Sequence, residues 1–189
     1  MDEGETVTDL FTPENIAHLQ QVEEDLRQTE GVFGVVSPLT ALQFTQNLVS
    51  SPTGDVTQSV AGQALLGARD REPDPAAQAI RLDDSVTTLN RINAVQGERT
   101  FENPEWIEFL LFDNRGEIRK SLRPFFPDEA HAQMITRLTG NESLEVEGAA
   151  ADRVDAIAQD EPFANATTTT TGAAALLKDL NDYLRGGML

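Results

Sequence analysis

Apolar residues recur every three or four positions over several stretches of the chain, which is the spacing of one face of a helix. The first such stretch follows Thr12-Pro13 and contains Ile16, Leu19, Val22 and Leu26. Gly31 stands after it. We therefore predict an amphipathic helix that begins at residue 12 and ends before Gly31.

Four helix starts share one pattern, in which a side chain that accepts a hydrogen bond from free backbone amides precedes a proline. These pairs are Thr12-Pro13, Ser37-Pro38, Asp74-Pro75 and Asn103-Pro104. Proline suits the first helical position because its missing N–H needs no partner there. The pattern predicts four helix N-termini.

Residues 32–36, Val-Phe-Gly-Val-Val, form a short run rich in β-branched residues that is apolar at both odd and even positions. Such a run is typical of a strand covered on both faces. We predict a central strand here. Residues 38–100 instead show only helical spacing, with breaks at 51–54 and 71–75. They are predicted to be a helical insertion of three segments.

An aromatic segment follows, because Phe101, Phe109, Phe112, Phe125 and Phe126 are five of the nine phenylalanines, and Trp106 is the only tryptophan. Residues 103–112 favour a short helix. The alternative is that residues 107–112 form one arm of a hairpin that turns at 113–116. The aromatic group is the best candidate for a surface that contacts something apolar, although packing in a core is the preferred interpretation.

The last third of the chain alternates between strand and helix signals. Residues 131–138 fit a strand or a helix almost equally, residues 143–160 fit a helix, and residues 176–184 fit a helix that ends at Gly186-Gly187. Residues 164–171 are predicted to be a strand, since five consecutive threonines favour a pleated sheet.

Without the insertion, the predicted order is helix, strand, strand, helix, strand, with residues 5–10 as a candidate first strand. This order matches the split βαβ, or ferredoxin-like, pattern. We therefore expect an α+β fold in a single domain over residues 1–189. Its core would comprise residues 1–37 and 101–189, and the mostly helical insertion would comprise residues 38–100.

The chain is strongly acidic, with a formal net charge of -18, and its only lysines are Lys120 and Lys178. This charge argues against binding to nucleic acid or to anionic membrane surfaces, both of which need clustered Lys and Arg. It suits a high-salt habitat, and an ordinary acidic surface explains it equally well. No apolar run reaches the roughly 20 residues of a membrane span, so we expect a water-soluble chain.

Candidate chemistry is sparse. The chain has no cysteine, and its two histidines, His18 and His131, fall in different predicted elements. The acidic cluster of Asp70, Glu72 and Asp74 lacks the glycine and terminal glutamate of a calcium loop. The adjacent pair Asp83 and Asp84 does not indicate a catalytic site, because adjacent acids are expected by chance in a chain with 32 acidic residues. We predict no catalytic, metal or cofactor-binding residue, no cofactor and no enzymatic activity.

Asn141 and Asn165 begin Asn-x-Ser/Thr sequons. Such triplets matter only on an exported surface, where they are acceptors for N-glycosylation.

Three stretches together resemble an extracytoplasmic domain of exporters of the resistance-nodulation-division superfamily, in the branch related to the mycobacterial large membrane proteins and hopanoid transporters. They are residues 11–15 with 31–39, residues 125–141, and the tail 171–189. The tail is similar to the point where a strand and a Thr-Gly-x-Pro turn lead into a helix that enters the membrane. In this chain alanine stands where the family has that proline.

The resemblance implies a porter-type domain of an exporter driven by a proton or ion gradient, on the extracytoplasmic face of the membrane. Its implied partners are the second extracytoplasmic domain and the membrane helices of the same transporter, with a hydrophobic or lipid-like substrate. Membrane spans are expected beyond both ends of the chain in the native protein. The family's proton-carrying residues belong to membrane helices, so the resemblance assigns that role to no residue of this chain. The alternative from another class is an extracytoplasmic ligand-binding or sensor domain.

Overall fold

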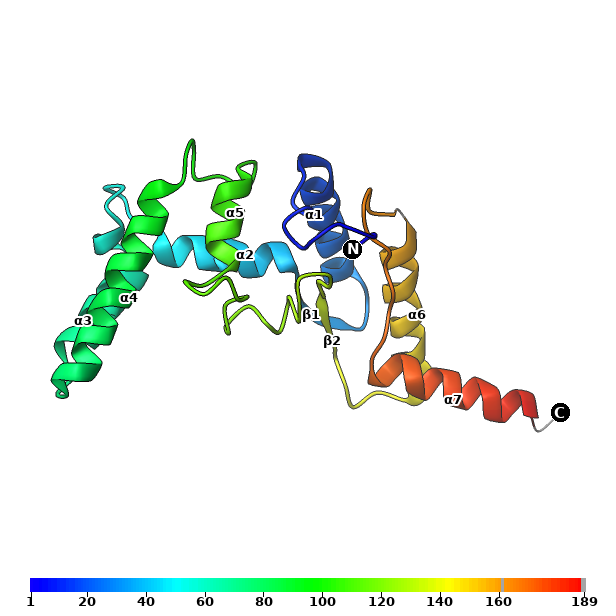
Figure 1. Cartoon of the computed structure of the whole chain (residues 1–189). Coiled ribbons are helices and arrows are strands. Elements are labelled where there is room, and N and C mark those ends of the chain that lie inside the picture. The colour runs from blue at the N-terminus through cyan, green and yellow to red at the C-terminus, as the bar shows by residue number, and fades with distance from the viewer. Residues whose placement is uncertain (161, 188–189) are drawn as a thin grey trace. The chain divides into compact units, whose positions relative to one another are not determined.

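The computed structural model describes residues 1–160 and 162–187, and the last two residues of the tail that carries the resemblance, Met188 and Leu189, lie outside this part. The chain has a mixed α+β fold (Figure 1) and divides into two compact units. The first unit comprises Met1–Leu39 and Ala130–Leu189, and the second comprises Thr40–Glu129. The second unit takes in residues 101–129, which sequence analysis assigns to the core.

Three helices belong to the first unit: α1 (Pro13–Gln28), α6 (Leu144–Asp160) and α7 (Ala173–Gly187). The predicted cap of α1 is confirmed, because the Thr12 side chain accepts a hydrogen bond from the amide of Asn15 at 3.2 Å. Leu19, Val22 and Leu26 of α1 are buried, as the helical spacing of apolar residues requires.

The sheet of the first unit pairs β1 (Val32–Val36) with β2 (Ile135–Leu138) in antiparallel register, with Val36 opposite Ile135. Val35 packs on one face with residues of both α1 and α6. On the other face Phe33 is 68% exposed and lies 4.8 Å beneath the guanidinium of Arg137. The prediction that this strand is covered on both faces is therefore wrong, since helices cover only one face.

Two further predicted strands do not form. Residues 6–10 make a turn, in which the carboxylate of Asp9 accepts from the amide and hydroxyl of Thr6. Residues 164–171 begin with an isolated bridge between Phe163 and Ala166 and continue without ladder pairing. The described residues thus form a two-stranded sheet, which confirms the α+β class and does not reproduce a complete ferredoxin-like sheet.

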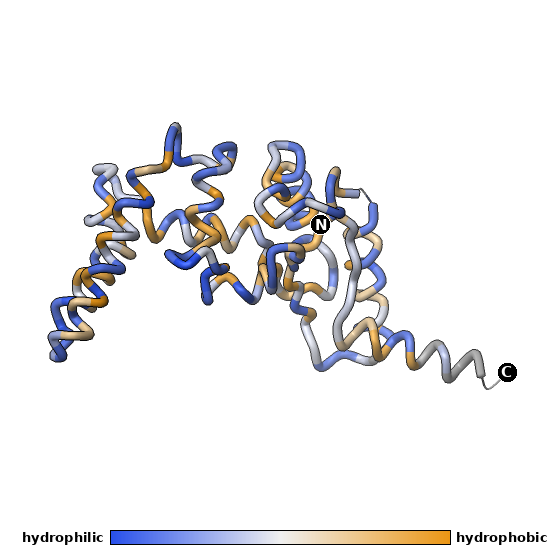
Figure 2. Tube along the Cα trace, viewed as in Figure 1, coloured by the Kyte–Doolittle hydropathy of each residue, from blue (hydrophilic) through white to orange (hydrophobic). Residues whose placement is uncertain are grey.

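The second unit is helical. Its elements are α2 (Pro38–Val49), the 3₁₀ turn η1 (Val56–Gln58), α3 (Val60–Asp70), α4 (Pro75–Ala94) and α5 (Pro104–Leu111). The first two residues of α2, Pro38 and Leu39, still belong to the first unit. The predicted breaks at 51–54 and 71–75 separate these helices, and the predicted caps Asp74 and Asn103 are confirmed. Helices α3 and α4 lie side by side (Figure 1), and apolar and polar positions alternate along both (Figure 2).

The core of the second unit is built around α5. Trp106 is 1% exposed and stacks on Phe109, with ring centroids 5.3 Å apart. The Trp106 indole donates to Gln46 Oε1 at 3.0 Å. The short helix predicted over residues 103–112 is confirmed and ends at Leu111. The turn of the alternative hairpin also forms, because Phe112 bridges Ile118 around residues 113–116.

Candidate functional site: an apolar groove in the first unit

A groove of about 700 Å³ opens in the first unit, and all its described lining residues belong to that unit. Its floor is apolar and comes from two helices. Helix α1 contributes Leu19, Val22 and Leu26, and helix α6 contributes Ala151, Val154 and Ala158. This volume lies in the range of pockets that hold small ligands.

One wall of the groove is residues 130–140, which contain β2. Exposure alternates along this wall, with Ala132, Met134, Thr136 and Leu138 partly buried and their neighbours exposed. Alternation of this kind is the pattern of a strand with one face turned inward. The even-numbered side chains therefore face the helices beneath.

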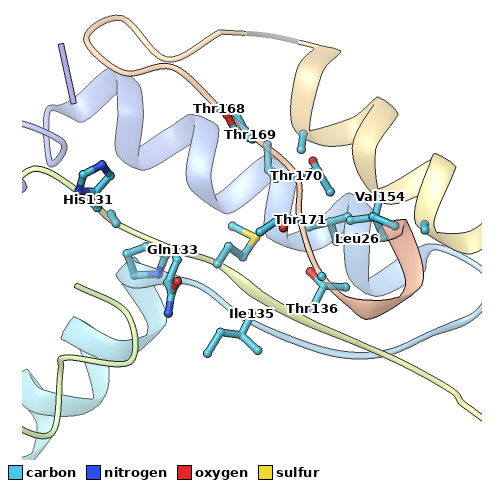
Figure 3. Close-up of a pocket in the computed structure, with 18 of the residues that line it drawn as sticks. Leu26, His131, Gln133, Ile135, Thr136, Val154, Thr168, Thr169, Thr170 and Thr171 are labelled. Atoms are coloured by element: carbon cyan, nitrogen blue, oxygen red, sulfur yellow. The ribbon is translucent and has the colours of Figure 1, made fainter. Parts of the chain in front are cut away.

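The opposite wall is the threonine segment, which we define as residues 167–171. Thr168 and Thr170 are partly buried, whereas Thr167, Thr169 and Thr171 are exposed. Figure 3 shows Thr168 to Thr171 around the same hollow as His131, Gln133, Ile135 and Thr136, together with Leu26 and Val154 from the two helices. The threonine segment is thus extended and half-buried although it pairs in no ladder.

Buried amides hold the start of the threonine segment in place. The Asn15 side chain, 1% exposed, donates to Asn165 Oδ1 at 2.8 Å and accepts from the amide of Ala164 at 3.3 Å. Asn165 Nδ2 donates to the carbonyl of Asp9 at 2.9 Å. Farther along, Gln159 of α6 donates to the carbonyl of Thr168. The position of this wall therefore follows from specific polar contacts.

Met1 lines the groove, and Asp2 forms a hydrogen bond beside it. The amino group of Met1 donates to the carbonyl of Ala130 at 2.7 Å, and the amide of Asp2 donates to the carbonyl of Asn165 at 3.0 Å. The two accepting carbonyls belong to the β2 wall and to Asn165, two residues before the threonine segment. Glu147 is the one Asp, Glu, Lys or Arg among the described lining residues, so the groove offers hydroxyl and apolar contacts and little charge.

The two histidines do not form a catalytic arrangement with each other. His18 of α1 packs edge-on against Phe163, with ring centroids 4.5 Å apart. His131 is exposed on the β2 wall of the groove. Among the described residues no group of three His, Asp or Glu side chains is placed to hold a metal ion.

The acidic candidates have structural contacts in the second unit. Asp70 pairs with Arg69 at 2.6 Å, and Glu72 pairs with Arg81 at 2.9 Å. Asp74 caps α4 by accepting from the amide of Ala76. Asp83 and Asp84 are exposed on α4, so the structure brings none of these carboxylates into the groove.

The aromatic group does not form a binding surface as a whole. Trp106, Phe109 and Phe126 are buried in the second unit, while Phe101, Phe112 and Phe125 are half-buried. The preferred interpretation, core packing, is confirmed for the buried three. Trp106 and Phe109 do not belong to a surface that contacts something apolar, because their rings are buried.

The sequons differ in accessibility. Asn141 is exposed and has a positive φ of 60°. Asn165 is half-buried, and its side-chain nitrogen, the atom that would carry a glycan, already donates a hydrogen bond.

Comparison of the chain with protein-family models, with curated proteins and with solved structures finds no match. Within the described residues, no helix is both long enough and apolar enough to cross a membrane.

Sequence reasoning missed the groove, although it flagged both walls as strand candidates. The floor alanines of α6, Ala151 and Ala158, carried a usable signal: small residues on the buried side of a helix leave room above them. The sequence pattern of one segment does not show how far that segment lies from the next one in space, so the width of the groove cannot be predicted from it.

Proposed function

We propose that this chain is a binding domain, namely an extracytoplasmic domain of a resistance-nodulation-division type exporter, in which the groove forms part of the path of a hydrophobic substrate. The observation that carries the proposal is the apolar groove of about 700 Å³ between residues 130–140 and the threonine segment. An apolar pocket with a few polar groups is the usual form of a small-molecule site.

The location of the groove supports the link to the exporter resemblance. Each of the three stretches that resemble the family contributes lining residues: Pro38 from the first, residues 130–140 from the second, and residues 171–175 from the tail. The segments that carry the resemblance are therefore also segments that build the groove. The buried aromatic side chains of the second unit take no part in this proposal.

Binding is tested with a neutral apolar dye, N-phenyl-1-naphthylamine, whose fluorescence rises in apolar surroundings. We expect saturable binding to the chain and a large loss of binding in Ala151→Trp, because Ala151 lies in the groove floor and an indole would fill the space above it. Ala149→Trp is the matched control, since Ala149 is on the same helix and exposed. Equal dye binding by both variants would contradict the proposed site.

The exporter assignment is tested in the native gene. We expect apolar segments of roughly 20 residues on both sides of this sequence. A native protein without such segments would remove the exporter assignment and leave a ligand-binding or sensor domain. Dye binding with a dissociation constant far below about 1 μM would favour that alternative as well, because a transport path must also release its substrate.

A further inference from the structure

We propose that the groove binds an extended polypeptide strand that runs antiparallel to both walls, with apolar residues at alternate, inward positions and Lys or Arg at the outward positions. This inference rests on the proposed function, in that it takes the groove to be a binding site. It goes further by assigning the chemistry of the occupant, which it derives from the main chain of the two walls.

The groove lies along an open edge of β2. The amide of Thr139 donates to the carbonyl of Gly31 on the β1 side at 2.9 Å. Main-chain groups of successive strand residues point to opposite sides, so those of Met134, Thr136 and Leu138 point away from β1. No residue of β1 lines the groove. The edge of β2 that faces the groove therefore presents unused donors and acceptors.

The threonine segment presents a second open edge. The carbonyl of Thr168 accepts from Gln159 of α6. Thr167, Thr169 and Thr171 line the groove. Because the main-chain groups of successive residues in an extended segment point to opposite sides, those of these three threonines point away from the contact with Gln159. Within the described part of the chain, no amide of the threonine segment donates a hydrogen bond to the protein.

The chain itself already places two residues as such a strand would be placed. Met1 donates to Ala130 on the β2 wall, and Asp2 donates to Asn165, two residues before the threonine segment. Consecutive residues that bond to opposite sides are the signature of a strand flanked by two neighbours. Both walls run away from this end, toward Gly140 and Gly172. A strand between them is therefore antiparallel to both or parallel to both, and the antiparallel ladder is the more stable one.

Side chains and charge define the rest of the occupant. The floor is built of Leu, Val and Ala side chains, so inward positions of the strand must be apolar. The chain carries a net charge of -18, which raises the local concentration of a cationic partner and repels an anionic one. A short basic peptide with alternating valine and lysine meets both requirements.

The first experiment uses such a peptide of about seven residues, acetylated and amidated at its ends. Isothermal titration calorimetry in concentrated salt removes non-specific attraction between charges. We expect saturable binding. The same peptide N-methylated at alternate valines keeps its side chains but loses main-chain donors, and it should bind at least about tenfold more weakly.

Two proline variants test the walls from the protein side. Thr169→Pro removes an amide that points toward the groove, and Thr168→Pro removes one that points away from it. We expect Thr169→Pro to weaken peptide binding about fivefold to tenfold, because one main-chain hydrogen bond is lost. Thr168→Pro should bind like the unmodified chain. Circular dichroism checks that each variant folds. If one variant does not fold, the comparison of the N-methylated peptide with the unmodified peptide still tests the proposal.

The outcomes separate this inference from the proposed function. If the dye binds while the peptide does not, or if N-methylation changes nothing, strand addition is wrong and the apolar binding site stands. If neither dye nor peptide binds, the proposed function fails as well. If copies of the chain dimerise through these open edges, added peptide should dissociate the dimers. Dimers that persist with no peptide bound would overturn strand addition.

Discussion

The two units use apolar side chains in opposite ways. In the second unit Trp106 and Phe109 stack, Trp106 donates to Gln46, and both rings are closed off from solvent. In the first unit Leu19, Val22 and Leu26 lie under a groove whose walls do not meet. The unit that is rich in aromatic residues is therefore the closed one, and the unit built from aliphatic residues and threonines is the open one.

This difference teaches that apolar content alone does not locate a binding surface. Aromatic side chains bury large areas, and in this chain those of the second unit bury them within the core of that unit. The groove exists because two extended segments stand apart over a helical floor. These segments can still form hydrogen bonds through their main chain, and a count of apolar residues does not detect this.

Trp106→Ala gives the largest expected effect and tests how closed the second unit is. The substitution removes a side chain that is 1% exposed together with its hydrogen bond to Gln46, so we expect a loss of about 3–5 kcal/mol in the free energy of unfolding. Urea unfolding followed by circular dichroism measures it. Trp106→Phe is the control and should cost clearly less. A loss below about 1 kcal/mol would mean that this core is not tightly packed.

Met134→Ala tests the open unit in the same assay. Met134 packs on the cluster of Val22, Leu26 and Val35 but also borders the groove. Because one side of the side chain already faces open space, truncation should cost about 1 kcal/mol, less than the 2–5 kcal/mol of a fully enclosed position. Met134→Leu should be nearly neutral. A cost as large as that of Trp106→Ala would show that the groove closes over Met134 in solution.

The pKa of Asp9 gives the smallest expected effect and concerns the turn that replaces the candidate first strand. Hydrogen bonding from the Thr6 amide, and secondarily from the Thr6 hydroxyl, lowers the pKa of Asp9 below its usual value of about 3.9. The folded state therefore holds the charged form more strongly. Its contribution to stability is present above pH 3.9 and is lost as the pH falls through the folded pKa. NMR titration should give a midpoint below that of an unfolded aspartate, and Thr6→Ala should raise it.

The helices of this chain and the strand at residues 32–36 are predictable from local sequence, whereas the strands predicted at residues 5–10 and 164–171 do not form. Thr12, Asp74 and Asn103 cap their helices because a helix start needs only an acceptor and a few free amides nearby. A strand needs a neighbour that is distant in sequence. The threonine segment has the propensity of a strand and lacks that neighbour, whereas residues 6–10 find a local alternative in the contacts between Asp9 and Thr6.

The same dependence on distant neighbours limits prediction of the site. The alternation at residues 131–138 and the five threonines mark both walls in the sequence. The gap between them depends on how Asn15 and Asn165 anchor one wall and how β1 positions the other. These are contacts between residues more than 90 positions apart, and no local window contains them.

The acidic surface has a consequence for the colloidal behaviour of the protein. Open strand edges are templates on which copies of a chain can stack into aggregates. At a net charge of -18, like-charge repulsion keeps copies apart in dilute buffer. The range of that repulsion shrinks from about 10 Å at 0.1 M salt to about 3 Å at 1 M. In brine the repulsion therefore protects the open edges much less. A peptide strand bound in the groove, as proposed above, would cover these edges and so reduce self-assembly.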